Sequence, residues 1–177
     1  LGVIGHFAAG SAEAAAAVLE QALATLRAEG CGLAIGPMDG NTWRRYRFVV
    51  DAGTEPPFFL EPENPPEYPD YFRAAGFVPL AEYSSALTED LAQQDVRIPG
   101  AIARLRAGGT DWRPFDPARF EAELRAIYRL SVISFTENFL YTPIGQTEFL
   151  AQYRAIEPHL DPELTLSAER EGEPVGY

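Results

Sequence analysis

The chain has 177 residues, enough to bury one sizeable core or one domain together with part of another. Hydrophobic residues make up 46% and aromatic residues 12% of it, a composition typical of globular proteins rather than disordered ones. The net charge of −12 argues against a nucleic-acid partner, because binding to phosphate backbones requires clustered Lys and Arg.

The first apolar run is too short to span a membrane and lacks a basic leader, so we expect no signal peptide and no membrane partner. The single cysteine, Cys31, cannot form an internal disulfide, which fits a reducing compartment and predicts a cytoplasmic protein. We interpret Cys31 as a small buried hydrophobe beside Leu33 and Ile35 rather than as a catalytic thiol.

The first predicted elements are a strand, a glycine turn and a helix. Residues 1–7 have the alternation of a strand, and residues 12–29 place apolar side chains at helical spacing up to the stop at Gly30. Between them, Gly10 allows close approach of the backbone and Ser11 can cap the helix. The N–H groups and the dipole at such a helix start favour a bound anion, although plain packing explains the same pattern.

The middle of the chain combines short strands with a proline-rich connector. Six prolines between residues 55 and 69 exclude both a helix and a central strand there. A short helix follows from Tyr68 and stops at Gly76, and Gly108-Gly109 marks a candidate domain linker. We predict strands over residues 31–36, 46–51 and 77–87.

The last part of the chain is predicted to contain a strand, two helices and a hairpin. Residues 110–116 form the strand, and Asp116-Pro117 is a typical helix start, since an N-cap residue is followed by proline at the first helical position. A loop over residues 142–145 precedes the second helix. The hairpin consists of strands 164–170 and 173–177 joined by a glycine turn.

Two of these segments carry a family signature. The turn Phe7-Ala8-Ala9-Gly10-Ser11-Ala12 fits the pattern Q/R-x-x-G-x-G/A, with Phe7 in place of the polar residue. The helix over residues 68–77 ends in the expected Gly-Phe, with Phe72 in a slot usually held by tyrosine and Tyr71 beside it. Together they resemble the C-terminal half of a GNAT-superfamily N-acetyltransferase, whose turn holds the pyrophosphate of acyl-CoA.

This resemblance implies an α/β fold with a mixed sheet flanked by helices, and acetyl-CoA as co-substrate. It assigns cofactor binding to Phe7, Ala8, Gly10, Ser11, Ala12 and to Asn64, which lies one residue from the position of the asparagine in the family's pattern.

The resemblance also implies a domain organisation. Residues 1–90 match the C-terminal half of one GNAT-like unit, residues 110–177 match the N-terminal half of a second, and residues 91–109 form the linker. The chain begins and ends inside predicted strands, so we interpret it as a fragment of a longer tandem protein. Because the halves complement each other, we expect the first strand to pair with the strand ending at Tyr177, within a permuted domain or by strand exchange in a homodimer.

Acetyl transfer from a thioester to an amine requires a base, N–H donors for the thioester oxygen and an acid for the thiolate. His6 is the candidate base because imidazole titrates near neutral pH; a plain polar residue on a strand face is the alternative. Glu61 and Glu63 are competing bases or solvated side chains. A helix turns by about 100° per residue, so Tyr71 and Phe72 cannot both face a cleft. We predict that Phe72 packs inward and that Tyr71, the candidate acid, lies along the rim.

Arg44, Arg45 and Arg47 form a basic cluster that suits phosphates or an acidic substrate, and ordinary salt bridges explain it equally well. We find no nucleotide P-loop, zinc-ligand spacing or Ser/His/Asp constellation, and therefore expect no metal site. The sequence predicts an acyltransferase that moves an acetyl group from acetyl-CoA to an amine of a small-molecule or other substrate. The alternative is a catalytically degenerate GNAT module that serves binding or scaffolding.

Overall fold

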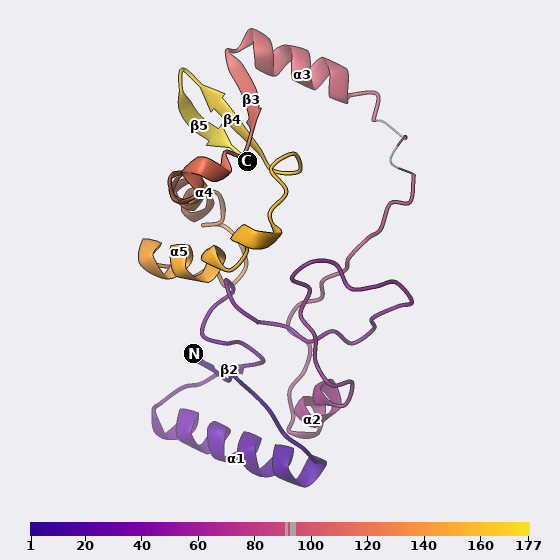
Figure 1. Cartoon of the computed structure of the whole chain (residues 1–177). Helices are drawn as coiled ribbons and strands as arrows, with labels where there is room; N and C mark the ends of the chain where they lie inside the picture. Colours follow the sequence, from indigo (N-terminus) through magenta and orange to yellow (C-terminus); the bar gives the residue numbers. More distant parts are fainter. Residues whose placement is uncertain (91, 93–94) are drawn as a thin grey trace. The chain divides into compact units, whose positions relative to one another are not determined.

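The computed structural model describes residues 1–90, 92 and 95–177, which form two compact units, Leu1–Ser84 and Ser85–Tyr177 (Figure 1). Helices and small sheets make each unit mixed α/β. The boundary lies earlier than the expected linker at 91–109, because helix α3, Ile98–Ala107, belongs to the second unit. The Gly108-Gly109 pair ends this helix, and Gly109 adopts a positive φ of 77°, so the glycines are a helix stop rather than a linker.

The first unit opens with a strand–helix–strand arrangement. Strand β1, Gly2–Val3, pairs in parallel with β2, Ala34–Ile35, and helix α1, Ala12–Ala28, connects them. The alanine-rich sequence favours the helix, Ser11 caps it as predicted, and Ala15 and Leu19 are its buried residues. The predicted strands around residues 1–7 and 31–36 are therefore present, but each is shorter than expected.

Helix α2, Tyr68–Ala74, completes the core of the first unit. Phe72 on this helix is buried with Ile4 and Leu19, and several partly buried aromatic rings surround them. Gly76 has a positive φ of 90° and ends the helix region as predicted. The core thus lies between α1, α2 and the β1–β2 pair.

The strands predicted over residues 46–51 and 77–87 do not form. The Val49 backbone is paired by the side-chain amide of Asn64 instead of by a neighbouring strand, with Val49 N–Asn64 Oδ1 at 2.8 Å and Asn64 Nδ2–Val49 O at 3.2 Å. Val78 is 81% exposed. Residues with high β-propensity were therefore not enough to form strands here, because these segments lack a neighbouring strand with which to form backbone hydrogen bonds.

The second unit contains an antiparallel sheet in the order β3-β4-β5, formed by β3 Thr110–Pro114, β4 Leu166–Arg170 and β5 Glu173–Gly176. Helix α4, Phe120–Ser134, packs against β5, and helix α5, Gln146–Arg154, packs against α4. The core of this unit includes Phe115, Phe149 and Leu150. The predicted helix start is confirmed: Asp116 Oδ1 accepts a hydrogen bond from Ala118 N at 3.0 Å, at the entry to the 3-10 turn Pro117–Arg119 that precedes α4. A second 3-10 turn, Glu157–His159, follows α5. The predicted hairpin is confirmed as β4 and β5.

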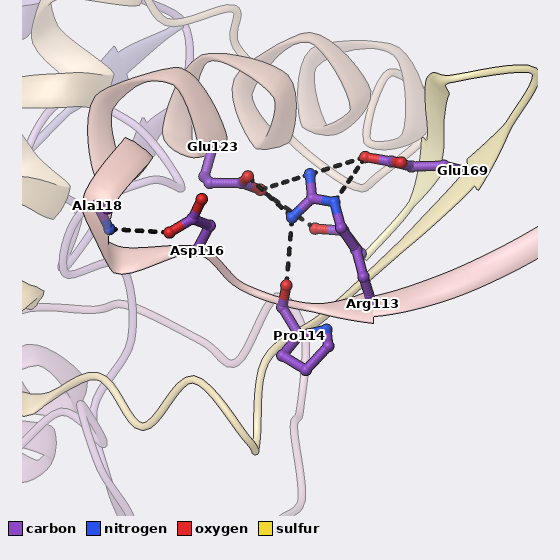
Figure 2. Close-up of polar contacts among 7 residues, drawn as sticks. Arg113, Pro114, Asp116, Ala118, Glu123 and Glu169 are labelled. Carbon is purple, nitrogen blue, oxygen red and sulfur yellow. Dashed lines mark hydrogen bonds and ion pairs between the residues drawn. The ribbon is translucent and has the colours of Figure 1, made fainter.

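Two ion pairs made by Arg113 join three elements of this unit (Figure 2). Arg113 on β3 contacts Glu123 on α4, with Nη1–Oε1 at 2.8 Å, and Glu169 on β4, with Nε–Oε1 at 2.8 Å. Ser167 Oγ adds a longer contact to Glu123 Oε2 at 3.4 Å. The Glu123 side chain is 2% exposed, so the arginine compensates a carboxylate that has lost its water.

The expected pairing of the first strand with the last one is wrong within a single chain. β1 pairs with β2, whereas β5 pairs with β4 in a separate sheet of the other unit. The crossover through α1 gives β1 a parallel partner, and the tight turn at Gly172 gives β5 a partner next to it in sequence. These pairings form because strands close in sequence pair at a smaller cost in chain entropy.

Candidate functional site

The loops that follow β1 and β2 lie directly against each other. Met38 N donates to Ile4 O at 2.8 Å, and a Cβ added at Gly5 would lie 2.2 Å from Met38 O, so only glycine fits there. We call residues 5–11 and 36–41 the carboxyl-edge loops, because both follow the carboxyl ends of parallel strands. Ligands of open α/β sheets bind at that edge.

His6 is the most exposed functional group of these loops. Its side chain is 77% exposed, and its backbone has a φ of 51°, which is uncommon for a residue other than glycine. Its N–H donates to Asp39 Oδ1 at 2.5 Å, and Nδ1 lies 3.7 Å from Asp39 Oδ2. An imidazole oriented by a carboxylate and open to solvent on its other side is suited to accept a proton.

The first turn of α1 contains a negatively charged side chain, Glu13. Ser11 has extended backbone and accepts from Ala14 N at 3.2 Å, while Ala12 is the first helical residue. The Glu13 pKa is lowered, first by a hydrogen bond from its own backbone N–H and second by one from the Ser11 hydroxyl. A ligand phosphate at this helix start would therefore meet the Glu13 carboxylate.

Phe7 packs against the aromatic core of the unit. Its ring makes edge contacts with Tyr68 at 4.9 Å and Phe72 at 5.0 Å between centroids. The Tyr68 hydroxyl accepts from Ala9 N at 3.1 Å, so one N–H of the turn is engaged within the chain. Ala8 and Gly10 are exposed, and a Cβ at Gly10 would meet nothing within 4 Å. The turn is therefore open to a ligand at Gly10. At Phe7 the turn packs against the side chains of Tyr68 and Phe72.

The predicted inward packing of Phe72 is confirmed, because its side chain is 3% exposed. Tyr71 is half-buried, and its ring lies 6.1 Å from that of Tyr68. Loss of hydration raises the pKa of Tyr71, and the Glu67 and Glu13 carboxylates raise it further. These effects disfavour ionisation of the Tyr71 hydroxyl.

Asn64 lies in a different setting from the other predicted cofactor residues. In addition to pairing with Val49, its Nδ2 donates to Pro65 O at 2.9 Å. The amide is thus occupied by the backbone at both ends of the loop between residues 49 and 64. These contacts give Asn64 a structural role in fixing that loop.

Arg47 of the basic cluster is held by ordinary packing and pairing. Its guanidinium carbon lies 5.1 Å from the Tyr46 ring centroid and 5.5 Å from that of Tyr83, and Nη2 is 3.4 Å from Glu61 Oε1. The salt-bridge interpretation is confirmed for this residue. Arg45 contacts the loop after β2 through its backbone, because its carbonyl oxygen accepts a hydrogen bond from Asp39 N at 2.8 Å.

Sequence reasoning missed Asp39 and the hydrogen bond between Tyr68 and the turn. Asp39 lies in a Pro-Met-Asp-Gly segment whose composition indicates only a turn, and its pairing with His6 across 33 positions leaves no local signal. Tyr68 begins α2, where its hydroxyl reaches back to Ala9. A signal for Asp39 lay in the strand–helix–strand order of residues 1–36, because such an order favours parallel strands whose following loops lie at one edge.

Within the residues that the structure describes, no cluster of three or more His, Cys, Asp and Glu side chains is arranged to hold a metal ion. Among the same residues no helix has the length and apolar character needed to cross a bilayer. Cys31 is half-buried.

Comparison of the chain with protein-family models, with curated proteins and with solved structures finds no match in any of the three.

Proposed function

We propose that the chain is a GNAT-like acyltransferase module that moves an acetyl group from acetyl-CoA to an amine, with His6 as the proton acceptor. The observation that carries this proposal is that the exposed His6 imidazole and the capped start of α1 both follow β1, at the edge where two parallel strands end. The first unit has the element order β1, α1, β2, α2, so the helix start and the second strand follow β1 directly in the chain.

In the proposed reaction the amine nitrogen attacks the thioester carbonyl carbon, a C–N bond forms and the C–S bond breaks. His6 Nε2 takes the proton that the amine nitrogen loses. The CoA thiolate leaves and takes a proton from solvent, because Phe72, the inward residue of α2, has none to give. The products are an amide and free CoA thiol.

The open space at Gly10 supports binding of acetyl-CoA at the turn. A pyrophosphate approaching the backbone there meets no side chain within 4 Å of the Gly10 Cβ position. Ala8, Ser11 and Ala12 flank this position and add only small side chains. In this proposal Phe7 packs the turn against the core of the first unit and does not contact the cofactor.

A second candidate function is a degenerate module that binds or scaffolds without catalysis. It is favoured by the groups that occupy the turn: the Tyr68 hydroxyl on Ala9 N–H and the Glu13 carboxylate at the helix start. A filled and negatively charged turn weakens binding of a diphosphate by repulsion and by competition for N–H donors.

Two proposals about partners accompany the reaction. The acceptor is an amine of a small molecule or of another substrate in the cytoplasm. The second proposal is a homodimer formed by strand exchange, in which β1 of one copy pairs with β5 of the other. Both strands are available for such pairing because each lies at the edge of a small sheet. Light scattering over a range of concentrations tests the second point, and a monomer at every concentration would contradict it.

The experiment that separates the two functions combines calorimetric titration of acetyl-CoA with a thiol-release assay in the presence of a panel of amines. Binding together with amine-dependent release of CoA thiol supports the acyltransferase. Binding without release supports the degenerate module. Absence of heat and of release contradicts both forms of the proposal.

A further inference from the structure

We propose that Asp39 is a positioning residue for His6, holding the backbone of His6 in its left-handed conformation and fixing the imidazole tautomer so that Nε2 is free to accept a proton. The reaction in which Nε2 acts rests on the proposed function. The positioning itself is a property of the two loops, and it is measurable without any substrate.

Asp39 holds the His6 backbone through one hydrogen bond. A residue with a side chain adopts a φ of 51° only when its surroundings favour that conformation. Here the His6 N–H donates to Asp39 Oδ1 at 2.5 Å. This bond fixes the chain at the point where β1 turns toward α1, and it leaves the His6 side chain exposed rather than packed on the strand face.

Asp39 is itself firmly placed. Its side chain is 12% exposed, and its N–H donates to Arg45 O at 2.8 Å. The neighbouring Met38 N is bonded to Ile4 O, and the missing Cβ of Gly5 allows the loop after β2 to touch the loop after β1. The carboxylate therefore has a fixed position from which to act on His6.

The second carboxylate oxygen acts on the imidazole. Oδ2 lies 3.7 Å from His6 Nδ1, within ion-pair distance and longer than a formed hydrogen bond. An ionised carboxylate only accepts hydrogen bonds, so it favours the tautomer with the proton on Nδ1. The lone pair then lies on Nε2, on the side of the ring away from Asp39, as a general base requires.

The alternative is that the Asp39 carboxylate has only a structural role, in which it accepts the His6 N–H and does not affect the imidazole. The variant Asp39→Asn separates the two roles. Its Oδ1 still accepts the His6 N–H, but its Nδ2 places hydrogen-bond donors opposite Nδ1. A donor there favours the tautomer with the proton on Nε2, which removes the lone pair from the exposed side. Asp51→Asn is the matched control, because Asp51 Oδ1 caps a turn at Gly53 N in the same unit at 2.9 Å.

Long-range proton–nitrogen correlation NMR of the full chain, at a pH where both imidazoles are neutral, reads the tautomer directly. The chain has two histidines, and His159 in the other unit serves as the internal reference. We expect mainly the Nδ1–H tautomer at His6 in the wild type and in Asp51→Asn, and mainly the Nε2–H tautomer in Asp39→Asn. A wild-type His6 that is mainly Nε2–H overturns the inference without any variant, and so does an unchanged tautomer in a folded Asp39→Asn.

Acetyl transfer measured on the same samples tests the proposed function separately. If His6 is the base, Asp39→Asn lowers the rate about tenfold, a loss on the order found when the partner that orients a functional histidine is removed. Absence of transfer by the wild type, together with the expected tautomers, contradicts the proposed function and supports the positioning of His6 by Asp39.

Discussion

Arg113 and Glu123 form a two-point ion pair between β3 and α4, with Nη1–Oε1 at 2.8 Å and Nη2–Oε2 at 3.2 Å. Glu123 is almost completely buried, whereas the Arg113 side chain remains 33% exposed. The Glu123 and Glu169 carboxylates raise the pKa of Arg113, so the guanidinium stays charged at any accessible pH. The pair is a structural clamp of the second unit.

Arg113→Ala should destabilise the second unit by about 3 kcal/mol, because it leaves the buried Glu123 carboxylate without compensation. Denaturation followed by Trp112 fluorescence in a Trp43→Phe background reports this unit, since the chain has two tryptophans. Arg129→Ala, an exposed change on the same α4, is the control. The double variant Arg113→Met/Glu123→Met should recover part of the loss. Equal effects of Arg113→Ala and Arg129→Ala would show that the clamp contributes nothing.

Gly5→Ala should destabilise the first unit by about 2 kcal/mol or more, because the new Cβ would lie 2.2 Å from Met38 O, a backbone atom that cannot move without displacing the loop. Gly32→Ala in the same unit is the matched control, since a Cβ there meets nothing within 4 Å. The measurement is denaturation followed by Trp43 fluorescence in a Trp112→Phe background. Similar stabilities of the two variants would mean that the carboxyl-edge loops are not in contact.

The secondary structure that local signals specify was predictable, and long-range pairing was not. Ser11 and Asp116 cap helices as their sequences indicate, and the glycine turn at Gly172 joins the predicted hairpin. The Val49 segment has the composition of a strand, yet a single amide from Asn64 satisfies its backbone. Composition alone cannot reveal which remote group supplies a partner.

The candidate site was predictable to a similar degree. His6 and the turn at Gly10 follow from the strand–turn–helix pattern, and the rotation of 100° per residue gave the inward position of Phe72. Asp39 and the contact of Tyr68 with the turn were missed, because each depends on a hydrogen bond from a backbone N–H distant in sequence. The interior position of Phe7 depends on the ring of Tyr68, which no local pattern indicates.

The Glu13 carboxyl should titrate below its ordinary value of 4.5, because its own backbone N–H and the Ser11 hydroxyl stabilise the ionised form. A lowered folded-state pKa means that the contribution of Glu13 to stability is present at neutral pH and is lost as the pH falls through that pKa. NMR titration should show a higher pKa in Ser11→Ala, with Glu20 on the same helix as the reference. An unchanged Glu13 pKa in Ser11→Ala would contradict the hydrogen bond from Ser11.

Tyr71→Phe should leave acetyl transfer almost unchanged, because Phe72, not Tyr71, is the inward residue of α2. Steady-state kinetics with the best amine of the panel provides the measurement. A rate loss of about a hundredfold or more would show that the Tyr71 hydroxyl serves as the acid for the thiolate.

Binding of acetyl-CoA at the turn is tested most directly by calorimetric titration of the wild type, Gly10→Ala and Gly32→Ala. Both positions are open in the free chain, so both variants should match the wild type in stability. If the pyrophosphate lies against the backbone at Gly10, Gly10→Ala should weaken acetyl-CoA binding at least tenfold, equivalent to about 1.4 kcal/mol, while Gly32→Ala binds as the wild type does. Equal affinities of all three proteins, or no binding by the wild type, would contradict a cofactor site at this turn.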